Sequence, residues 1–136
     1  MKIMIFIVWM LILTTTINAY PVIISEQGTN HTLNKEIVYS YPERYYRGVD
    51  SVTFTNQPLN ISGHLKTGGY EVKWWWRWSY YYFYDAKIRV YGVQIINYTY
   101  VDMKDGLNHE LCHHQEFYKL HKKVANETYA ETCVLG

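Results

Sequence analysis

The sequence predicts a mainly β or α+β fold: an antiparallel sheet or sandwich of about six to seven strands, followed by one C-terminal α-helix. The first observation is the segment 73–84, where nine of twelve residues are aromatic. Aromatic side chains suit a pleated, half-buried surface, so this segment predicts a strand. The second is the alternation of apolar and polar side chains in several shorter segments. The third is a change to helical spacing that begins near Leu107.

The N-terminal segment is typical of a secretory signal peptide. Lys2 precedes an apolar run at residues 3–13, and the small residue Ala19 marks the expected cleavage site. The run is shorter than the roughly 20 apolar residues of a membrane-spanning helix, so a membrane anchor is the weaker interpretation. We therefore expect residues 1–19 to be removed. Residues 20–136 then form one secreted, extracellular β-rich domain that does not span a membrane.

Charge and sequence motifs narrow the class of partner. The formal net charge is +1, which argues against nucleic acid or an anionic membrane surface as the partner. In a secreted chain, Asn-x-Ser/Thr triplets are candidate glycosylation sites. Four such triplets follow the signal peptide, at Asn30, Asn60, Asn97 and Asn126. The sequence thus predicts a glycoprotein with an extracellular partner.

Short strands are predicted before the aromatic stretch. They lie at residues 20–25, 37–41, 49–55 and 59–65. Pro21 lacks a backbone donor, so we expect the first of them at a sheet edge. In the third strand, alternation directs Val52 and Phe54 to the core. A glycine-containing turn at residues 67–69 then leads into the aromatic strand.

The register after the aromatic strand decides which of its faces is buried. A two-residue turn at residues 85–86 would place charged residues beside the aromatic face, whereas a three-residue loop at residues 85–87 pairs Tyr84 with Ile88. Burial favours the three-residue loop, followed by a strand at residues 88–100. One face then points to the core, and it carries Trp74, Trp76, Trp78, Tyr80, Tyr82 and Tyr84.

Part of that face is the candidate ligand site. Trp74, Trp76, Trp78 and Tyr80 lie away from the expected loop, and their polar atoms favour a position where one end stays wet. They predict a pocket or groove for an apolar small molecule or a sugar. The alternative is that all of these side chains are ordinary core.

The C-terminal helix is predicted at about residues 106–126, with Asp105 as its cap. Its apolar face carries Leu107, Leu111, His114, Tyr118, His121 and Ala125, and its solvent face carries Glu116, Lys119, Lys123 and Asn126. The chain has two cysteines, Cys112 and Cys133, and an oxidising compartment favours a disulfide between them. Free thiols or pairing with another chain are the alternatives.

His109-Glu110-Leu111-Cys112-His113 is the chemical motif of the chain. On a helix, two histidines four residues apart share one face and can bind one zinc ion. This stretch resembles the zinc-binding helix of zincin metallopeptidases. The resemblance implies that His109 and His113 are metal ligands, that Glu110 is the catalytic base, and that Glu127 or Glu131 is the third ligand, with Glu131 preferred.

Two interpretations of function remain open. The chain departs from the extended metzincin pattern at Glu116 and Lys119, so we expect a binding protein rather than an enzyme, without a cofactor or bound metal. Its ligand would be a small apolar molecule, a glycan or an extracellular protein. The alternative is a small zinc metallopeptidase that uses the His-Glu-x-x-His motif.

Overall fold

The computed structural model describes residues 20–78, 80–120 and 126–135. The predicted signal peptide, residues 1–19, lies outside the described residues. The elements in chain order are β1 (Val22–Ser25), α2 (His31–Tyr39), the short 3₁₀ helix η1 (Glu43–Tyr46), β2 (Val49–Thr55), β3 (Leu59–Ile61), β4 (His64–Lys66), β5 (Gly68–Arg77), β6 (Tyr80–Tyr91), α3 (Tyr100–Tyr118) and α4 (Glu127–Thr132). The predicted fold class is confirmed in part, since the chain combines six strands with two main helices.

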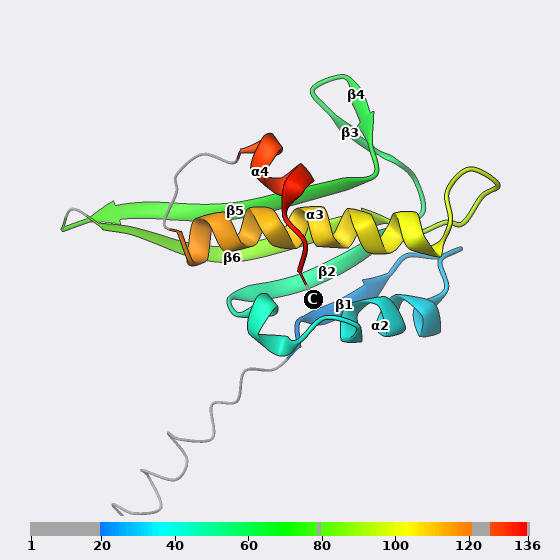
Figure 1. The fold of residues 1–136 in the computed structure, drawn as a ribbon, viewed down its shortest axis with the longest axis horizontal. Helices are drawn as coiled ribbons and strands as arrows, with labels where there is room; N and C mark the ends of the chain where they lie inside the picture. The colour runs from blue at the N-terminus through cyan, green and yellow to red at the C-terminus, as the bar shows by residue number, and fades with distance from the viewer. Residues whose placement is uncertain (1–19, 79, 121–125, 136) are drawn as a thin grey trace, which may run out of the picture.

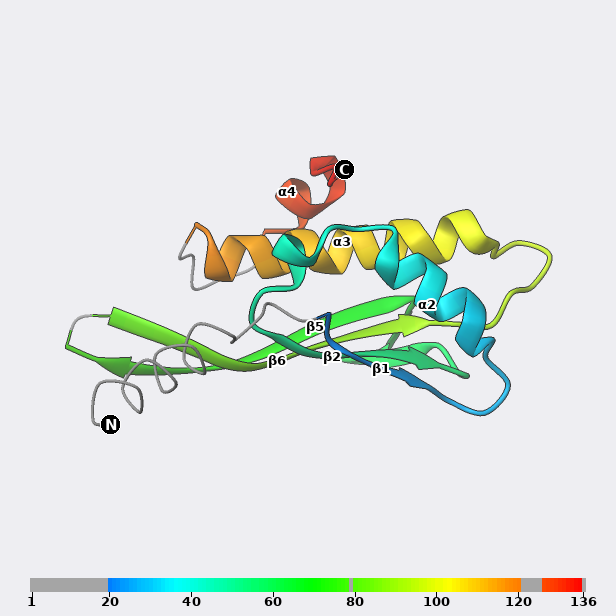
Figure 2. The same cartoon turned by 90° about the horizontal axis from the view of Figure 1, so that it is seen from below.

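The strands form one mixed four-stranded sheet and one small ribbon. The order in the larger sheet is β1-β2-β6-β5. The expected antiparallel pairing joins β5 to β6 and β3 to β4, whereas β1, β2 and β6 run parallel. The helices lie on one face of the larger sheet, so the layer that packs on it is helical (Figures 1 and 2). Strand β1 is at an edge of the sheet, as predicted.

The hydrophobic core lies between this sheet and the helices. Val52 and Phe54 of β2 are fully buried, which confirms the predicted face of that strand. They pack with apolar side chains of β6, α2 and α3, including Ile88, Val90, Ile37, Val38, Met103, Leu107 and Leu111. Each such side chain contributes about 1.5–3 kcal/mol by leaving water. Among the described residues, no helix is long and apolar enough to cross a membrane.

The prediction of a strand at residues 37–41 is wrong, because this segment belongs to α2. Asn30 caps the helix, and its side chain accepts a hydrogen bond from the backbone N–H of Leu33 at 3.1 Å. Ile37 and Val38 are fully buried. Their helical spacing from Leu33 and Asn34 buries one face against the sheet, and this burial outweighs the strand preference of β-branched residues.

The predicted loop at residues 85–87 is also wrong. Strand β6 runs through this segment, and the hairpin reverses between Arg77 and Tyr80, which pair with each other. Residues 84 and 87 of β6 pair with residues 73 and 71 of β5, so the longer β6 segment forms a β-bulge. Asp85 has a φ of 55°, the left-handed conformation that such a bulge uses. The polar residues that suggested a turn therefore mark a bulge.

The five described side chains of the predicted core face, Trp74, Trp76, Trp78, Tyr82 and Tyr84, are exposed, which contradicts their predicted place in the core. The exposed fraction is 44% for Trp74, 55% for Trp76 and 75% for Trp78. The hairpin extends past the end of α3, so no helix lies over its far part (Figure 1). The bulge also turns Phe83 towards the helix layer, where it contacts Phe117 with ring centroids 5.4 Å apart. The predicted ligand residue Tyr80 has its side chain outside the described part of the chain.

Helix α3 begins earlier than predicted and ends at Tyr118. Thr99 is the N-cap and forms a capping box with Asp102, so the prediction of Asp105 as cap is wrong. Residues 121–125 of the predicted helix, with His121, Lys123 and Ala125, lie outside the described residues. Lys119 is exposed as predicted, but Glu116 is completely buried and its assignment to a solvent face is wrong.

Candidate metal centre

The middle of α3 is buried because this helix lies between the sheet and α4 (Figure 2). Leu107 and Leu111 pack into the core, while Cys112 is bonded to the segment that follows α4. The polar side chains of His109, Glu110 and His113 are directed to a pocket bordered by β5 and α4. The helix therefore buries polar groups that an amphipathic helix on a sheet would expose to water.

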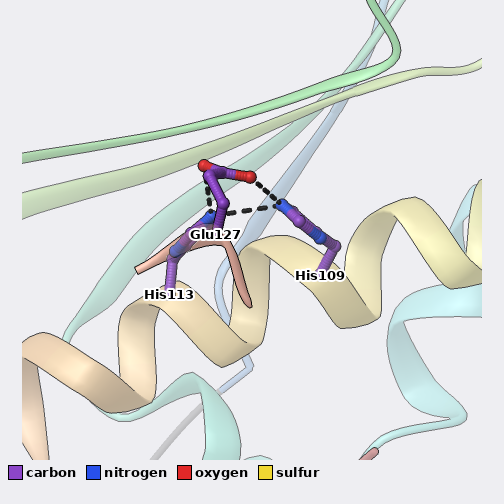
Figure 3. A group of neighbouring side chains, drawn as sticks. All are labelled: His109, His113 and Glu127. Carbon is purple, nitrogen blue, oxygen red and sulfur yellow. Dashed lines mark hydrogen bonds and ion pairs between the residues drawn. The ribbon is translucent and has the colours of Figure 1, made fainter. Parts of the chain in front are cut away.

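Three side chains from α3 and α4 converge at this pocket (Figure 3). Nε2 of His109 lies 3.2 Å from Nε2 of His113. The two carboxylate oxygens of Glu127 divide between them: Oε2 is 3.1 Å from Nε2 of His109, and Oε1 is 3.2 Å from Nε2 of His113. The residues that form this group are His109, His113 and Glu127.

The chemistry of these atoms fits a cation. A carboxylate oxygen only accepts hydrogen bonds, and a neutral imidazole accepts at the nitrogen that carries no proton. The buried carboxylate of Glu116 lies 3.3 Å from Nδ1 of His113, so the hydrogen-bond network places the proton on Nδ1 and leaves Nε2 as an acceptor. Nε2 of His113 and Oε1 of Glu127 then face each other as two acceptors without a hydrogen between them. A positive charge between these atoms, such as that of a metal ion, makes this contact favourable.

The spacing of the same atoms fits zinc. A tetrahedral zinc ion about 2.0–2.1 Å from each nitrogen or oxygen ligand holds its ligand atoms about 3.3 Å apart. The two imidazole nitrogens, 3.2 Å apart, match two corners of such a tetrahedron, and each lies 3.1–3.2 Å from one oxygen of the Glu127 carboxylate, Oε2 for His109 and Oε1 for His113. One ligand atom from each of the three residues can be chosen so that all lie within 4.8 Å of one another. Two imidazoles and one glutamate are also a ligand set of catalytic zinc sites, which keep their fourth position open.

Helix α4 is held beside α3 at both of its ends. After α4, the Cys112–Cys133 disulfide is present as predicted, with Cα atoms 6.1 Å apart. Asn108 of α3 donates from Nδ2 to the carbonyl of Cys133 at 2.8 Å and accepts at Oδ1 from the N–H of Leu135 at 3.0 Å. Before α4, the backbone N–H of Asn126 donates to the Glu116 carboxylate at 3.1 Å. These contacts place the first turn of α4, and with it Glu127, over the histidines.

Glu110 is buried beside this group, with an exposed fraction of 6%. Burial and, to a smaller extent, the negative charge of Glu127 together raise the pKa of its carboxyl group to about 8, while the positive charge of Lys66 opposes the rise. The strand opposite allows this position because residue 68 is glycine. A β-carbon at Gly68 would lie 2.7 Å from Oε1 of Glu110.

The pocket has a volume of about 980 Å³ and separates α3 and α4 from β5. Its polar lining includes the three candidate ligands and Glu110, together with Lys66 from β4. Its apolar lining includes Tyr70, Val72, Trp74 and Phe117. The pocket therefore places polar groups of opposite charge beside an aromatic wall.

His114, next to the motif, belongs to the structural core. Its Nε2–H donates to the carbonyl of Arg47 at 2.6 Å, and its Nδ1 accepts from the hydroxyl of Tyr70 at 2.8 Å. Burial lowers the pKa of His114 to about 4. This histidine is therefore a neutral residue with both ring nitrogens engaged, and it faces away from the candidate metal ligands.

The structure separates the predicted site residues into groups. It brings Glu127 to the histidines, whereas Glu131 is exposed further along α4 and is not in the three-residue group. Trp74 lines the same pocket, and Trp76 and Trp78 are exposed on the hairpin. The four predicted glycosylation sites, Asn30, Asn60, Asn97 and Asn126, are all exposed.

Two residues of the site escaped the sequence analysis. Glu116 follows His113 by three residues, a spacing that puts both on one helix face, but its charge suggested a solvent position. Gly68 was assigned to a turn, although a glycine within a strand also marks a close approach of another group. Both patterns are present in the sequence, and the structure identifies their partners: His113 and Asn126 for Glu116, and Glu110 for Gly68.

Comparisons with models of known protein families, with curated proteins and with solved structures found no match for this chain.

Proposed function

We propose that this protein is a zinc-dependent hydrolase that cleaves peptide bonds. The observation that carries the proposal is the convergence of His109, His113 and Glu127, whose ligand atoms lie within 4.8 Å of one another, with the buried carboxyl group of Glu110 in the same pocket. This revises the preference for a non-catalytic protein, because the structure brings together a donor set that the sequence left scattered over 18 residues. Helix α4 supplies the third ligand.

The residues of the pocket divide the chemistry between them. His109, His113 and Glu127 would hold the zinc ion, which when bound supplies Lewis acidity towards a carbonyl group and a water molecule. The Glu110 carboxylate would take a proton from the attacking water and give it to the amine that leaves, which regenerates the carboxylate. Its raised pKa suits both halves of this proton transfer near neutral pH.

Strand β5 supports a peptide as the substrate. It occupies an edge of the sheet and borders the pocket along residues 68–72. An extended peptide can add to such an edge through backbone hydrogen bonds, which bind it with little regard to its side chains. A carbonyl group of that peptide would then lie between Glu110 and the candidate zinc ligands.

The test combines zinc binding with hydrolysis. Purified protein is dialysed against zinc, and its metal content and its cleavage of a quenched-fluorescent peptide library are measured. We expect one zinc ion per chain and cleavage that stops when a chelator is added. Glu110→Gln should keep the metal and lose hydrolysis by about 10²–10⁴-fold.

The ligands are tested by matched substitutions. His109→Ala and Glu127→Gln should each weaken zinc binding by more than about 100-fold, since loss of a group that only supports a ligand already costs 10–100-fold. Glu131→Gln removes the same charge from the same helix and should leave binding unchanged. Wild-type protein that retains no zinc, or Glu110→Gln protein that hydrolyses peptides at the wild-type rate, would refute the proposal.

The exposed hairpin favours a second candidate function, the binding of an extracellular ligand. Trp75 and Tyr82 stack across the two strands with ring centroids 4.8 Å apart, and Trp76 and Trp78 expose more than half of their surface. Exposed aromatic faces of this kind bind sugar rings, apolar molecules or protein surfaces. The predicted ligand residues Trp74, Trp76 and Trp78 would belong to this surface.

A glycan array and a soluble-protein pull-down from secreted material test this second candidate. Binding that is present in the wild type, lost in Trp76→Ser and retained in Glu110→Gln would support a ligand surface independent of hydrolysis. Equal binding by wild-type and Trp76→Ser protein would remove it. The two functions are compatible, because Trp74 belongs to the hairpin and also lines the pocket, so the aromatic surface continues into the candidate active site.

Secretion and glycosylation are part of the proposal. The disulfide is consistent with an oxidising compartment, and the four asparagines of the sequons are exposed. We expect cleavage near Ala19 and glycans at Asn30, Asn60, Asn97 and Asn126. Mass spectrometry of protein secreted from eukaryotic cells would show a mature N-terminus near residue 20 with added hexose, and an intact Met1 without glycans would contradict this prediction.

A further inference from the structure

We propose that Glu116 is a positioning residue of the metal centre. It fixes one ligand on α3, His113, and the ligand on α4, Glu127. This inference rests on the proposed zinc site. Glu116 is completely buried in the interior of α3, and its carboxylate contacts His113 and the backbone of Asn126. It therefore connects one ligand directly with the residue that precedes another ligand.

The contact with His113 fixes the orientation of one ligand. Oε1 of Glu116 lies 3.3 Å from Nδ1 of His113, and a carboxylate in this position accepts the Nδ1 proton. The proton on Nδ1 leaves Nε2 free for a metal ion, and the negative charge makes that nitrogen a better donor to the metal. The carboxylate also limits rotation of the ring, because the hydrogen bond is broken when the ring turns.

The contact with Asn126 fixes the position of the other ligand. The N–H of Asn126 lies 3.2 Å from Oε1 and 3.1 Å from Oε2 of Glu116. Asn126 is the N-cap of α4, and its own side chain accepts from the N–H of Tyr129 at 3.2 Å. Glu127 is the next residue. The carboxylate of Glu116 thus holds the start of α4 at the point where Glu127 turns towards the histidines.

Burial explains why this carboxylate needs both contacts. A buried charge without hydrogen-bond partners is costly, so a completely buried glutamate is retained only where donors surround it. Here the donors are a candidate ligand and the N-cap of the helix that carries another. A purely structural residue at this position would be expected to be apolar, since replacing a buried charge by a well-packed apolar group is often neutral or stabilising.

Glu116→Gln is the informative variant, because it keeps the shape of the side chain and removes its charge. We expect zinc affinity, measured by competition with a chromophoric chelator, to fall about 10–100-fold. We also expect the Nδ1–H form of His113 to give way to a mixture of both tautomers, seen by long-range ¹H–¹⁵N correlation NMR of the metal-free protein at about pH 8, above the ordinary histidine pKa.

Asn108→Ala is the matched control, because the side chain of Asn108 also holds α4 but forms its hydrogen bonds with Cys112, Cys133 and Leu135 rather than with a candidate ligand. It should lower the thermal midpoint and leave the His113 tautomer unchanged. The inference is overturned if wild-type protein binds zinc and Glu116→Gln protein binds it within about twofold with an unaltered tautomer. Wild-type protein that binds no zinc overturns instead the proposed function on which the inference rests.

Discussion

Replacing Gly68 by alanine should impair hydrolysis while leaving the metal ligands untouched. Gly68 is the first residue of β5 and lies opposite Glu110. A β-carbon at this position would approach Oε1, Cγ and Cδ of Glu110 to 2.7, 3.2 and 3.3 Å. Because the carboxyl group ends a flexible side chain, it would move away, whereas His109, His113 and Glu127 would keep their positions.

The size of the effect follows from these distances. Oε1 must move from 2.7 Å to an ordinary contact of at least 3.4 Å, a displacement of about 0.7 Å. A misplacement of about 1 Å in a catalytic group can cost about 100-fold in rate, so we expect kcat/KM for peptide cleavage to fall on the order of 10–100-fold. Alanine also restricts the unfolded chain, so the free energy of unfolding should change by less than about 1 kcal/mol.

The assay compares Gly68→Ala with Gly69→Ala on the quenched-fluorescent peptide library. A β-carbon at Gly69 would instead meet Leu59 at 3.2 Å and Ile61 at 3.4 Å, at the ends of apolar side chains outside the metal group. Gly69→Ala should lose less activity than Gly68→Ala, and both variants should bind zinc as the wild type does. Peptide cleavage by Gly68→Ala protein at the wild-type rate would refute the proposal that Glu110 acts as the base from its position opposite Gly68.

Three further predictions concern stability and the aromatic hairpin. Burial lowers the pKa of His114 from 6.5 to about 4, so its neutral form stabilises the folded state fully above pH 6.5. As the pH falls to about 4, the free energy of unfolding should decrease by up to about 3 kcal/mol. His114→Gln should abolish this pH-dependent contribution in urea titrations of the metal-free protein. Cys133→Ser should lower the free energy of unfolding by about 2–5 kcal/mol and weaken zinc binding, because α4 loses its covalent connection to α3; equal zinc affinity in Cys133→Ser protein would contradict this coupling. Trp78 has a φ of 54° and an exposed side chain, so Trp78→Gly should raise the thermal midpoint or leave it unchanged, whereas a clear decrease would show that the indole supports the fold.

Local sequence patterns predicted the elements that bury one face against a single neighbouring layer. Val52 and Phe54 alternate on a strand with one buried face, and the structure confirms their place in the core. The Cys112–Cys133 disulfide followed from the number of cysteines and the expected compartment. The helix around Leu107 and Leu111 followed from spacing that reports contact with the sheet.

The failures arose where burial depends on distant parts of the chain. The aromatic strand has the composition of a core strand, but the hairpin extends beyond α3 (Figure 1), and Trp76 and Trp78 are exposed. The bulge at Asp85 then changes which side chains face the helices, and its polar residues suggest a turn as readily as a bulge. Glu116 carries a charge that normally favours solvent. One of its partners, His113, is on the same helix, but the other, Asn126, is the N-cap of α4 and comes ten residues later in the chain.

The candidate site was half visible in the sequence. The His-Glu-x-x-His spacing identified His109, Glu110 and His113 because one helix carries all three. The third ligand depends on where the disulfide and Asn108 place α4, so the sequence left Glu127 and Glu131 as alternatives. The structure favours Glu127, which stands at the start of α4 beside both histidines.

X-ray absorption spectroscopy at the zinc edge of zinc-loaded protein tests the central claim most directly. Coordination by His109, His113 and Glu127 predicts one zinc ion per chain, with two imidazole nitrogens and oxygen ligands at about 2.0–2.2 Å and no sulfur. Glu127→Gln should change the oxygen shell, and Glu131→Gln should give the wild-type spectrum. A zinc–sulfur distance of about 2.3 Å, or a shell without imidazole, would contradict the account.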